Sequence, residues 1–158
     1  MAGLNHDSVA AFCAQIGKDP LLVQGAGGNV SWKEKNTLWI KASGTWLGEA
    51  QIKSIFVPAD LAHLRHEISM ENFSVKPKIT SAALLLPSIE TTLHALLPHQ
   101  LVVHLHAIEA LSFLVLANPQ IAFEKIQKSM DEPLLLIPYC QPGPKLAREI
   151  VQQIAGLN

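Results

Sequence analysis

The chain has 158 residues with a formal net charge of −1, and 49% of its residues are hydrophobic while 16% are charged. This composition excludes a disordered chain, and the balanced charge gives no reason to expect binding to nucleic acid. Its apolar runs, such as residues 82–87, are far too short to cross a bilayer, and the N-terminal segment lacks the basic start of a signal peptide.

The length favours a single domain with a core of its own, and the N-terminal half alternates helix and strand signals. Ser8 is expected to be the N-cap of a helix over residues 8–17, which carries apolar side chains at helical spacing. Leu38 and Ile40 then alternate with their neighbours beside a turn at residues 34–36, and this pattern predicts a β-hairpin.

A short strand is expected next, then a helix in which Pro58 is an early residue, and then a loop over residues 69–78. The rest is predicted to form a helix with Ser88 as its N-cap, a strand, two helices, a strand and a final helix, over residues 88–97, 100–107, 108–117, 120–129, 133–139 and 144–156. The alternation predicts an α/β protein. Cys13 and Cys140 have no paired spacing, so we expect buried thiols in a cytoplasmic protein.

Two histidines, His104 and His106, lie in the predicted strand over residues 100–107. Side chains two residues apart on a strand point to the same face, so both imidazoles can reach one cation. Their apolar neighbours would exclude part of the water from the site, and this strengthens the Lewis acidity of a bound metal. The alternative is that these histidines are buried and hydrogen-bonded, because a zinc site normally has a third protein ligand.

A carboxylate, Glu90, lies in the first turn of the helix that leads into this strand. The positive end of the helix dipole favours its ionised form, and it could ligate the metal or act as a general base. His94 follows four residues later on the same helical face and could hold the carboxylate in place. The alternative is an ordinary acidic residue at a helix start.

Two glycine-containing stretches, residues 25–31 and 41–45, could bind an anion. Glycines allow positive φ and let backbone N–H groups approach an anion closely. Neither stretch has the spacing of a dinucleotide-binding or nucleoside-triphosphate-binding loop. Asn29, Ser43 and Ser88 could add side-chain donors for a phosphate or carboxylate. The alternative is a pair of tight turns in a hairpin.

Five stretches occur in a fixed order: "GAGGNVS", "WIKASGTWL", "PSIE", "VVHLHA" and "IPYCQPGPKLAREI". Together, over about residues 20–150, they resemble the class II aldolase/adducin family, which includes zinc-dependent sugar-phosphate aldolases. The resemblance implies an α/β fold of three layers, α/β/α, around a central and mostly antiparallel sheet. It also implies that residues 1–158 form one domain of this type.

The resemblance further implies roles for individual residues. Glu90 would be the acid/base, and His104 and His106 would bind zinc or another divalent metal. The substrate phosphate would contact Gly28, Asn29, Ser43, Gly44 and Ser88. The implied reaction is retro-aldol cleavage of a sugar phosphate through a metal-stabilised enediolate. The implied protein is a cytoplasmic homo-oligomer, a tetramer by resemblance, that binds neither nucleic acid nor membrane.

Three departures from the family pattern affect these expectations. Ile89 stands where the family usually has a second serine, which weakens the phosphate pocket or shifts it toward another anion. The family's third zinc histidine lies on a strand beyond the helix that begins at Pro144, and the sequence stops at Asn158 before such a strand. The single tyrosine, Tyr139, lies in the "IPY" stretch and does not match the tyrosine that some aldolases present from a neighbouring subunit.

We therefore expect a truncated or partial domain that associates with itself and binds zinc weakly through two histidines. Three other functions stay open from the sequence. One is an adducin-like interaction domain without catalysis. Another is a related epimerase, dehydratase or decarboxylase that uses the same enolate chemistry. The last is a metal-free module that binds small anions.

Overall fold

The predicted hairpin forms the middle of the sheet in the computed structural model, which describes residues 4–82 and 84–155. Strand β1 (Asn29–Glu34) pairs antiparallel with β2 (Thr37–Lys41). Lys35 takes a φ of 52° in the connecting turn, which is the backbone conformation that a two-residue hairpin requires. The turn predicted at residues 34–36 is thus confirmed.

Two further strands extend the hairpin on both sides, in the order β3-β2-β1-β4. Strand β3 (Phe56–Asp60) pairs with β2, and β4 (Leu101–His104) pairs with β1. All three pairings are antiparallel. Because β1 and β4 are far apart in the sequence, their pairing brings residues 29–32 beside residues 101–104.

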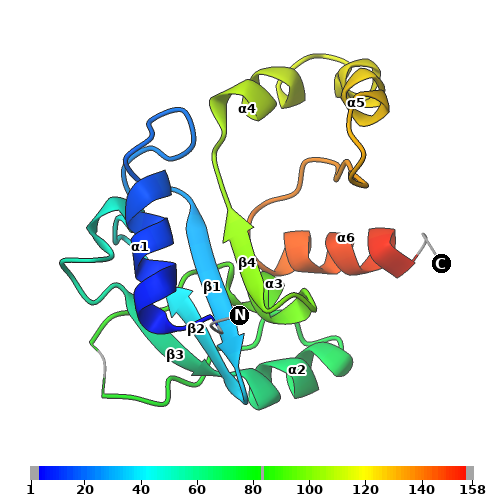
Figure 1. The fold of residues 1–158 in the computed structure, drawn as a ribbon. Helices are drawn as coiled ribbons and strands as arrows, with labels where there is room; N and C mark the ends of the chain where they lie inside the picture. Colours follow the sequence, from blue (N-terminus) through cyan, green and yellow to red (C-terminus); the bar gives the residue numbers. More distant parts are fainter. Residues whose placement is uncertain (1–3, 83, 156–158) are drawn as a thin grey trace.

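One face of the sheet is covered by helix α1 (His6–Ile16) and by the short 3₁₀ helix η1 (Leu47–Glu49). Val30 and Trp32 of β1 point to this face and pack in one buried cluster with Val9 and Cys13 of α1. Figure 1 shows α1 lying across this side of the strands.

The opposite face is covered by α2 (Leu61–Ser69) and α3 (Thr91–Leu96). Leu38 and Ile40 of β2 pack there with Leu64 and Ala95 in a second buried cluster. Burying a Leu or Ile side chain stabilises a fold by about 1.5–3 kcal/mol, so both clusters hold helices against the sheet. The three-layer α/β/α arrangement around an antiparallel sheet is therefore confirmed.

The first helix begins earlier than predicted. Its N-cap is Asn5, whose Oδ1 accepts the Ser8 N–H at 2.9 Å, while the Ser8 Oγ accepts the Asn5 N–H at 3.1 Å. The predicted N-cap at Ser8 is wrong, because Ser8 closes this reciprocal capping box from inside the helix.

The prediction that Pro58 belongs to a helix is also wrong. Pro58 lies in β3, an outer strand of the sheet. Proline is tolerated on an outer strand, because a residue there can have its N–H side away from the neighbouring strand. Helix α2 starts only at Leu61, and the Asp60 carboxylate caps it by accepting the His63 N–H at 2.9 Å.

Ser88 is not the N-cap of its helix, because α3 starts three residues later at Thr91. Its Oγ accepts the Glu90 N–H at 3.2 Å, and its carbonyl oxygen accepts the Thr91 N–H at 3.1 Å. Ser88 therefore shapes the turn that precedes the helix. Glu90 occupies the N-cap position, and its side chain caps no backbone N–H of α3.

The strand predicted over residues 100–107 is confirmed in part, because β4 covers Leu101–His104 and ends there. The strand predicted over residues 133–139 is wrong, since these residues, all in the described part of the chain, belong to no helix or strand. Strand geometry requires a hydrogen-bonded neighbour, and among the described residues no strand lies beside 133–139.

Three helices confirm the predictions for the C-terminal third: α4 (Ile108–Leu114), α5 (Pro119–Lys128) and α6 (Pro144–Ala155). Helices α4 and α5 contain no buried residue and lie beyond the end of β4, at the top of Figure 1. Helix α6 returns to pack against α3 and buries Ala147. The predicted helix end at Gly156 lies outside the described residues.

No helix within residues 4–82 and 84–155 is long and apolar enough to cross a membrane. Of the two cysteines, Cys13 is buried in α1, whereas Cys140 is half-buried, which corrects the expectation that both are buried. Burial raises the pKa of the Cys13 thiol to about 12, with a smaller opposing effect from the nearby Lys41 charge.

We predict that native protein at pH 8 is alkylated by iodoacetamide at Cys140 and not at Cys13. A thiol with a pKa near 12 has only about one part in ten thousand thiolate at pH 8, and thiolate is the reactive form. Peptide mass spectrometry after a short exposure measures both sites, and protein unfolded in urea serves as the control in which both react. Comparable rates at the two cysteines in native protein would contradict the described burial of α1.

Candidate functional site

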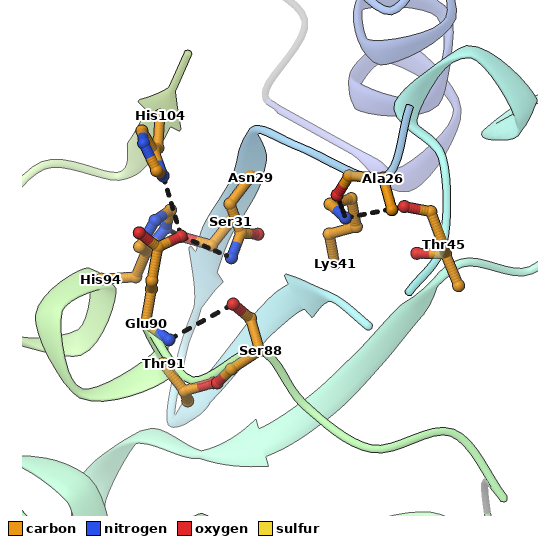
Figure 2. A network of polar contacts seen from close by, with 10 residues as sticks. All are labelled: Ala26, Asn29, Ser31, Lys41, Thr45, Ser88, Glu90, Thr91, His94 and His104. Atoms are coloured by element: carbon orange, nitrogen blue, oxygen red, sulfur yellow. Dashed lines mark hydrogen bonds and ion pairs between the residues drawn. The ribbon is translucent and has the colours of Figure 1, made fainter. Parts of the chain in front are cut away.

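A carboxylate and an imidazole meet at the end of the sheet. Glu90 Oε2 lies 2.8 Å from His104 Nδ1, and Asn29 Nδ2 donates to the same carboxylate oxygen at 3.4 Å. Asn29 is the direct partner of His104 across β1 and β4, so both side chains point to the face that α3 covers. Figure 2 shows Glu90 reaching from the start of α3 toward both.

The surroundings of Glu90 favour its ionised form. Burial by itself raises the pKa of this carboxyl, whose side chain is 12% exposed, but the hydrogen bond and charge of His104, with the Asn29 amide, outweigh it, so the pKa lies below its ordinary value. An ionised carboxylate can only accept, so His104 Nδ1 carries the proton and donates it. The other ring nitrogen, Nε2, then has a free lone pair in the neutral imidazole.

His106 lies beside His104, with ring centroids 4.9 Å apart and an angle of 60° between the rings. The two rings come together as predicted, but the strand does not cause it, because β4 has already ended. His106 is held instead by its own N–H, which donates to the Leu22 carbonyl at 3.0 Å. Its ring rests against Gly27, where an added Cβ would lie 2.7 Å from His106 Nδ1.

Lys41 connects the two glycine-containing stretches. Its ammonium donates to the Ala26 carbonyl at 3.0 Å and to the Thr45 carbonyl at 2.7 Å, one on each loop (Figure 2). Lys41 is only 3% exposed. Burial lowers the pKa of this ammonium, while the charge of Glu90 opposes the change. The Lys41 ammonium therefore joins the two loops, and the Glu90 carboxylate is a negative charge near it.

The remaining predicted site residues lie around this connection. Gly28 has a φ of 68° and lies so near His104 that an added Cβ would be 3.1 Å from its carbonyl oxygen. Gly44 has a φ of 75°, and the Ser43 N–H donates to the Leu86 carbonyl at 2.8 Å. That bond brings the turn at residues 42–45 beside Ser88. The structure thus gathers all the predicted phosphate-contacting residues, while their function stays a prediction.

His94 does not hold the Glu90 carboxylate, contrary to expectation. Its Nδ1 lies 2.8 Å from Ser31 Oγ, and both side chains are fully buried between α3 and β1. Burial lowers the pKa of His94 to about 4, with the Glu90 charge opposing it, so the ring is neutral near pH 7. His94 therefore joins a helix to a strand.

The side chains at this site are of the types that bind a divalent metal, but there are fewer of them than a zinc site normally has. Imidazole nitrogens and a carboxylate oxygen are typical zinc ligands, and a histidine that donates its Nδ1 proton to a carboxylate is oriented for ligation through Nε2. Within the described residues, however, no group of three His, Cys, Asp or Glu side chains converges on one point. His63 lies elsewhere, on α2, with its Nδ1 3.9 Å from the Glu67 carboxylate.

Three residues lie within the predicted anion-binding stretches, but the sequence analysis gave them no individual role: Gly27, Ser31 and Lys41. Lys41 carried a signal, since it is a charged residue between the apolar Ile40 and Ala42 in a predicted strand. Ser31 also carried one, because it lies two residues after Asn29 and so shares its face of the strand. Gly27 carried none, since its neighbour His106 is 79 positions away in the chain.

Comparisons with known proteins give one family. The profile of the family described as "Class II Aldolase and Adducin N-terminal domain" matches residues 7–158. A curated relative, the uncharacterized oxidoreductase YuxG of Bacillus subtilis (strain 168), is 27% identical in an alignment 157 residues long that covers 89% of this chain and 22% of that protein. The chain therefore spans about a fifth of the length of this relative.

Two solved structures are similar in fold. The N-terminal class II aldolase domain of a conserved protein from Thermoplasma acidophilum is 30% identical with a TM-score of 0.76, over 96% of this chain and 76% of that one. The L-fuculose-1-phosphate aldolase from Thermus thermophilus is 16% identical with a TM-score of 0.54, over 92% of this chain and 70% of that one. At that identity the second similarity concerns the fold alone.

We predict that Gly27→Ala displaces the His106 ring. The added methyl would lie 2.7 Å from His106 Nδ1 and 2.9 Å from the Gln24 carbonyl oxygen. Both contacts are too short, so the loop backbone must shift slightly and the His106 ring, which has the shorter contact, must move away. The measurement is NMR of the ring protons of His104 and His106, whose chemical shifts depend on the separation of the two rings. Gly25→Ala is the control for backbone strain in the same loop, because its φ of 55° strains a side chain while its Cβ meets nothing within 4 Å and so cannot push the ring. Unchanged His106 ring signals in Gly27→Ala would contradict the described contact.

Proposed function

Because the chain belongs to the class II aldolase and adducin N-terminal domain family, we propose that it acts as a metal-dependent lyase. The reaction is retro-aldol cleavage of a sugar phosphate. The observation that carries the proposal is the 2.8 Å contact between Glu90, whose pKa is lowered, and the His104 ring. It provides an ionised base directly beside an imidazole whose second nitrogen is free.

In the cleavage direction Glu90 takes the proton of the substrate hydroxyl as the C–C bond breaks, and it then gives that proton to the carbon next to the carbonyl. In the condensation direction Glu90 takes the proton from that carbon. Its ionised form is the competent base near pH 7, since its pKa lies below the ordinary value. The Asn29 amide and the His104 ring fix the carboxylate, and the Ser88 hydroxyl fixes the backbone N–H of Glu90. A base held by three contacts loses little entropy when it reacts.

His104 and His106 would hold the divalent metal, zinc by family resemblance. When bound, such an ion supplies positive charge that lowers the cost of forming a carbanion beside a carbonyl. Glu90 would orient the His104 ring through its Nδ1 proton, as carboxylates do for many metal-binding histidines.

The substrate phosphate would lie between the two glycine-containing loops. Gly28 and Gly44 keep these backbones open to an anion, and Asn29, Ser43 and Ser88 offer polar side chains around them. Lys41 contributes a positive charge at the junction of the loops. Ile89 is largely exposed beside Ser88 and adds no donor there, so other anionic groups than phosphate stay within the proposal.

An epimerase, dehydratase or decarboxylase of the same family would use the same base and the same metal ligands, and substrate assays distinguish these reactions. A non-catalytic adducin-like domain is less well supported. Burying an ionised carboxylate costs free energy unless partners compensate it, and a purely structural surface gains nothing from such burial. We also propose a cytoplasmic homo-oligomer, a tetramer by resemblance, which the exposed apolar side chains of α4 and α5 support.

We predict that His104→Ala or His106→Ala lowers bound zinc, with at least about a tenfold loss of affinity because each removes one ligand. Bound zinc is measured by elemental analysis after dialysis against a fixed zinc concentration. His63→Ala and His66→Ala are matched controls on α2 and should bind zinc like the unaltered protein. Equal zinc in all four variants would remove the histidine pair from the proposal.

We predict that Glu90→Gln abolishes proton exchange at the substrate carbon while the fold and most of the metal are kept. A general base contributes about 10²–10⁴ to such a step, so deuterium uptake into dihydroxyacetone phosphate should fall by a factor of that order. NMR measures the uptake in D₂O. Glu67→Gln, which changes a carboxylate on α2, is the control that should leave uptake unchanged. Undiminished uptake in Glu90→Gln would exclude Glu90 as the base.

A further inference from the structure

Two pairs of side chains connect α3 to β1 at matching intervals. Glu90 meets Asn29, and His94 meets Ser31 at 2.8 Å. Four residues of helix advance about 6 Å along the axis, and two residues of strand advance about 7 Å. The two intervals are nearly equal, so both pairs can form only when the helix is at one position along the strand.

The other elements that contact this helix are α2, α6 and the apolar cluster beneath it. The helix contains six residues, and a helix this short does not form by itself in water. Ala95 anchors it to the apolar cluster beneath, but apolar contacts are non-directional and tolerate a small slide. A hydrogen bond between buried groups does not tolerate a slide, since it weakens steeply as its geometry departs from the optimum.

The Ser31–His94 pair is also well protected. His94 is 1% exposed and Ser31 is 0% exposed, and the His94 N–H donates to the Glu90 carbonyl at 3.0 Å within the helix. The imidazole is thus tied by its backbone to Glu90 and by its side chain to β1. By contrast, the 3.4 Å contact between Asn29 and Glu90 is long and would be lost after a small displacement.

We propose that Ser31 and His94 are positioning residues for Glu90. Their hydrogen bond holds α3 at the height on β1 where the Glu90 carboxylate reaches both Asn29 and the His104 ring. Neither residue touches the reacting atoms. This proposal rests on the proposed function, because it concerns the position of Glu90, the proposed base. The contact of Glu90 with His104 can nevertheless be measured whether or not the protein is a catalyst.

The test follows the proton on His104 Nδ1, which the contact with Glu90 shields from water. It is observed by ¹H–¹⁵N NMR of histidine side chains in metal-free protein with a chelator, and it is assigned from its absence in His104→Gln. We expect Ser31→Ala and His94→Leu to speed its exchange with water by about tenfold or more, since the carboxylate then leaves its place part of the time.

Two further variants separate positioning from general loosening of the fold. His94→Asn places a polar atom where Nδ1 was and should restore exchange to within about twofold of the unaltered protein. Thr92→Val removes a hydroxyl from another buried residue of α3 and should leave the exchange unchanged. If Ser31→Ala fails to fold, the comparison of His94→Leu with His94→Asn decides.

The proposal is overturned if folded Ser31→Ala and His94→Leu keep the slow exchange, or if Thr92→Val speeds it equally. The measurement uses neither substrate nor metal, so its outcome is independent of the lyase assignment. Conversely, if Glu90→Gln kept full deuterium uptake into the substrate, the lyase assignment would fail. The exchange of the His104 Nδ1 proton with water would still test the positioning role of Ser31 and His94.

Discussion

The largely buried Glu90 carboxylate is the constraint on which the rest of the site depends. A charge removed from water must be compensated by polar partners, and the structure provides them from two separate elements. His104 comes from the end of β4 and Asn29 from the start of β1, while the Ser88 hydroxyl accepts the backbone N–H of Glu90. Each partner can reach the carboxylate only if its element has the described position, so one buried charge fixes the mutual arrangement of sheet and helix.

The antiparallel pairing of β1 with β4 makes this arrangement possible. It puts Asn29 directly opposite His104, and the alternation of side chains turns both to the face under α3. A slip of one residue in this pairing would turn His104 to the other face and leave Glu90 without its strongest partner. The ionised form of Glu90 therefore depends on the register between β1 and β4, two strands that are distant in the sequence.

A second buried charge organises the neighbouring loops. The Lys41 ammonium donates two hydrogen bonds to the backbone carbonyls of Ala26 and Thr45, so the two loops are joined by the protein's own contacts. Preformed loops bind with less loss of entropy than loops that must order on binding. Glu90 on one side and Lys41 on the other place a carboxylate and a cation at separate, fixed positions, as the proposed reaction of a substrate with an acidic carbon and an anionic group requires.

The sequence by itself determined the local features of this protein. Alternating apolar residues fixed the hairpin, helical spacing fixed most helices, and the ordered motifs indicated the family and the residues around Glu90. The tertiary structure alone decided the features that depend on distant parts of the chain. His94 pairs with Ser31 and not with Glu90, Lys41 joins two loops, and Pro58 lies in an outer strand. The segment 133–139 forms no strand for the same reason: a strand and a buried polar group both need partners, and a pattern in sequence does not say which distant residue supplies them.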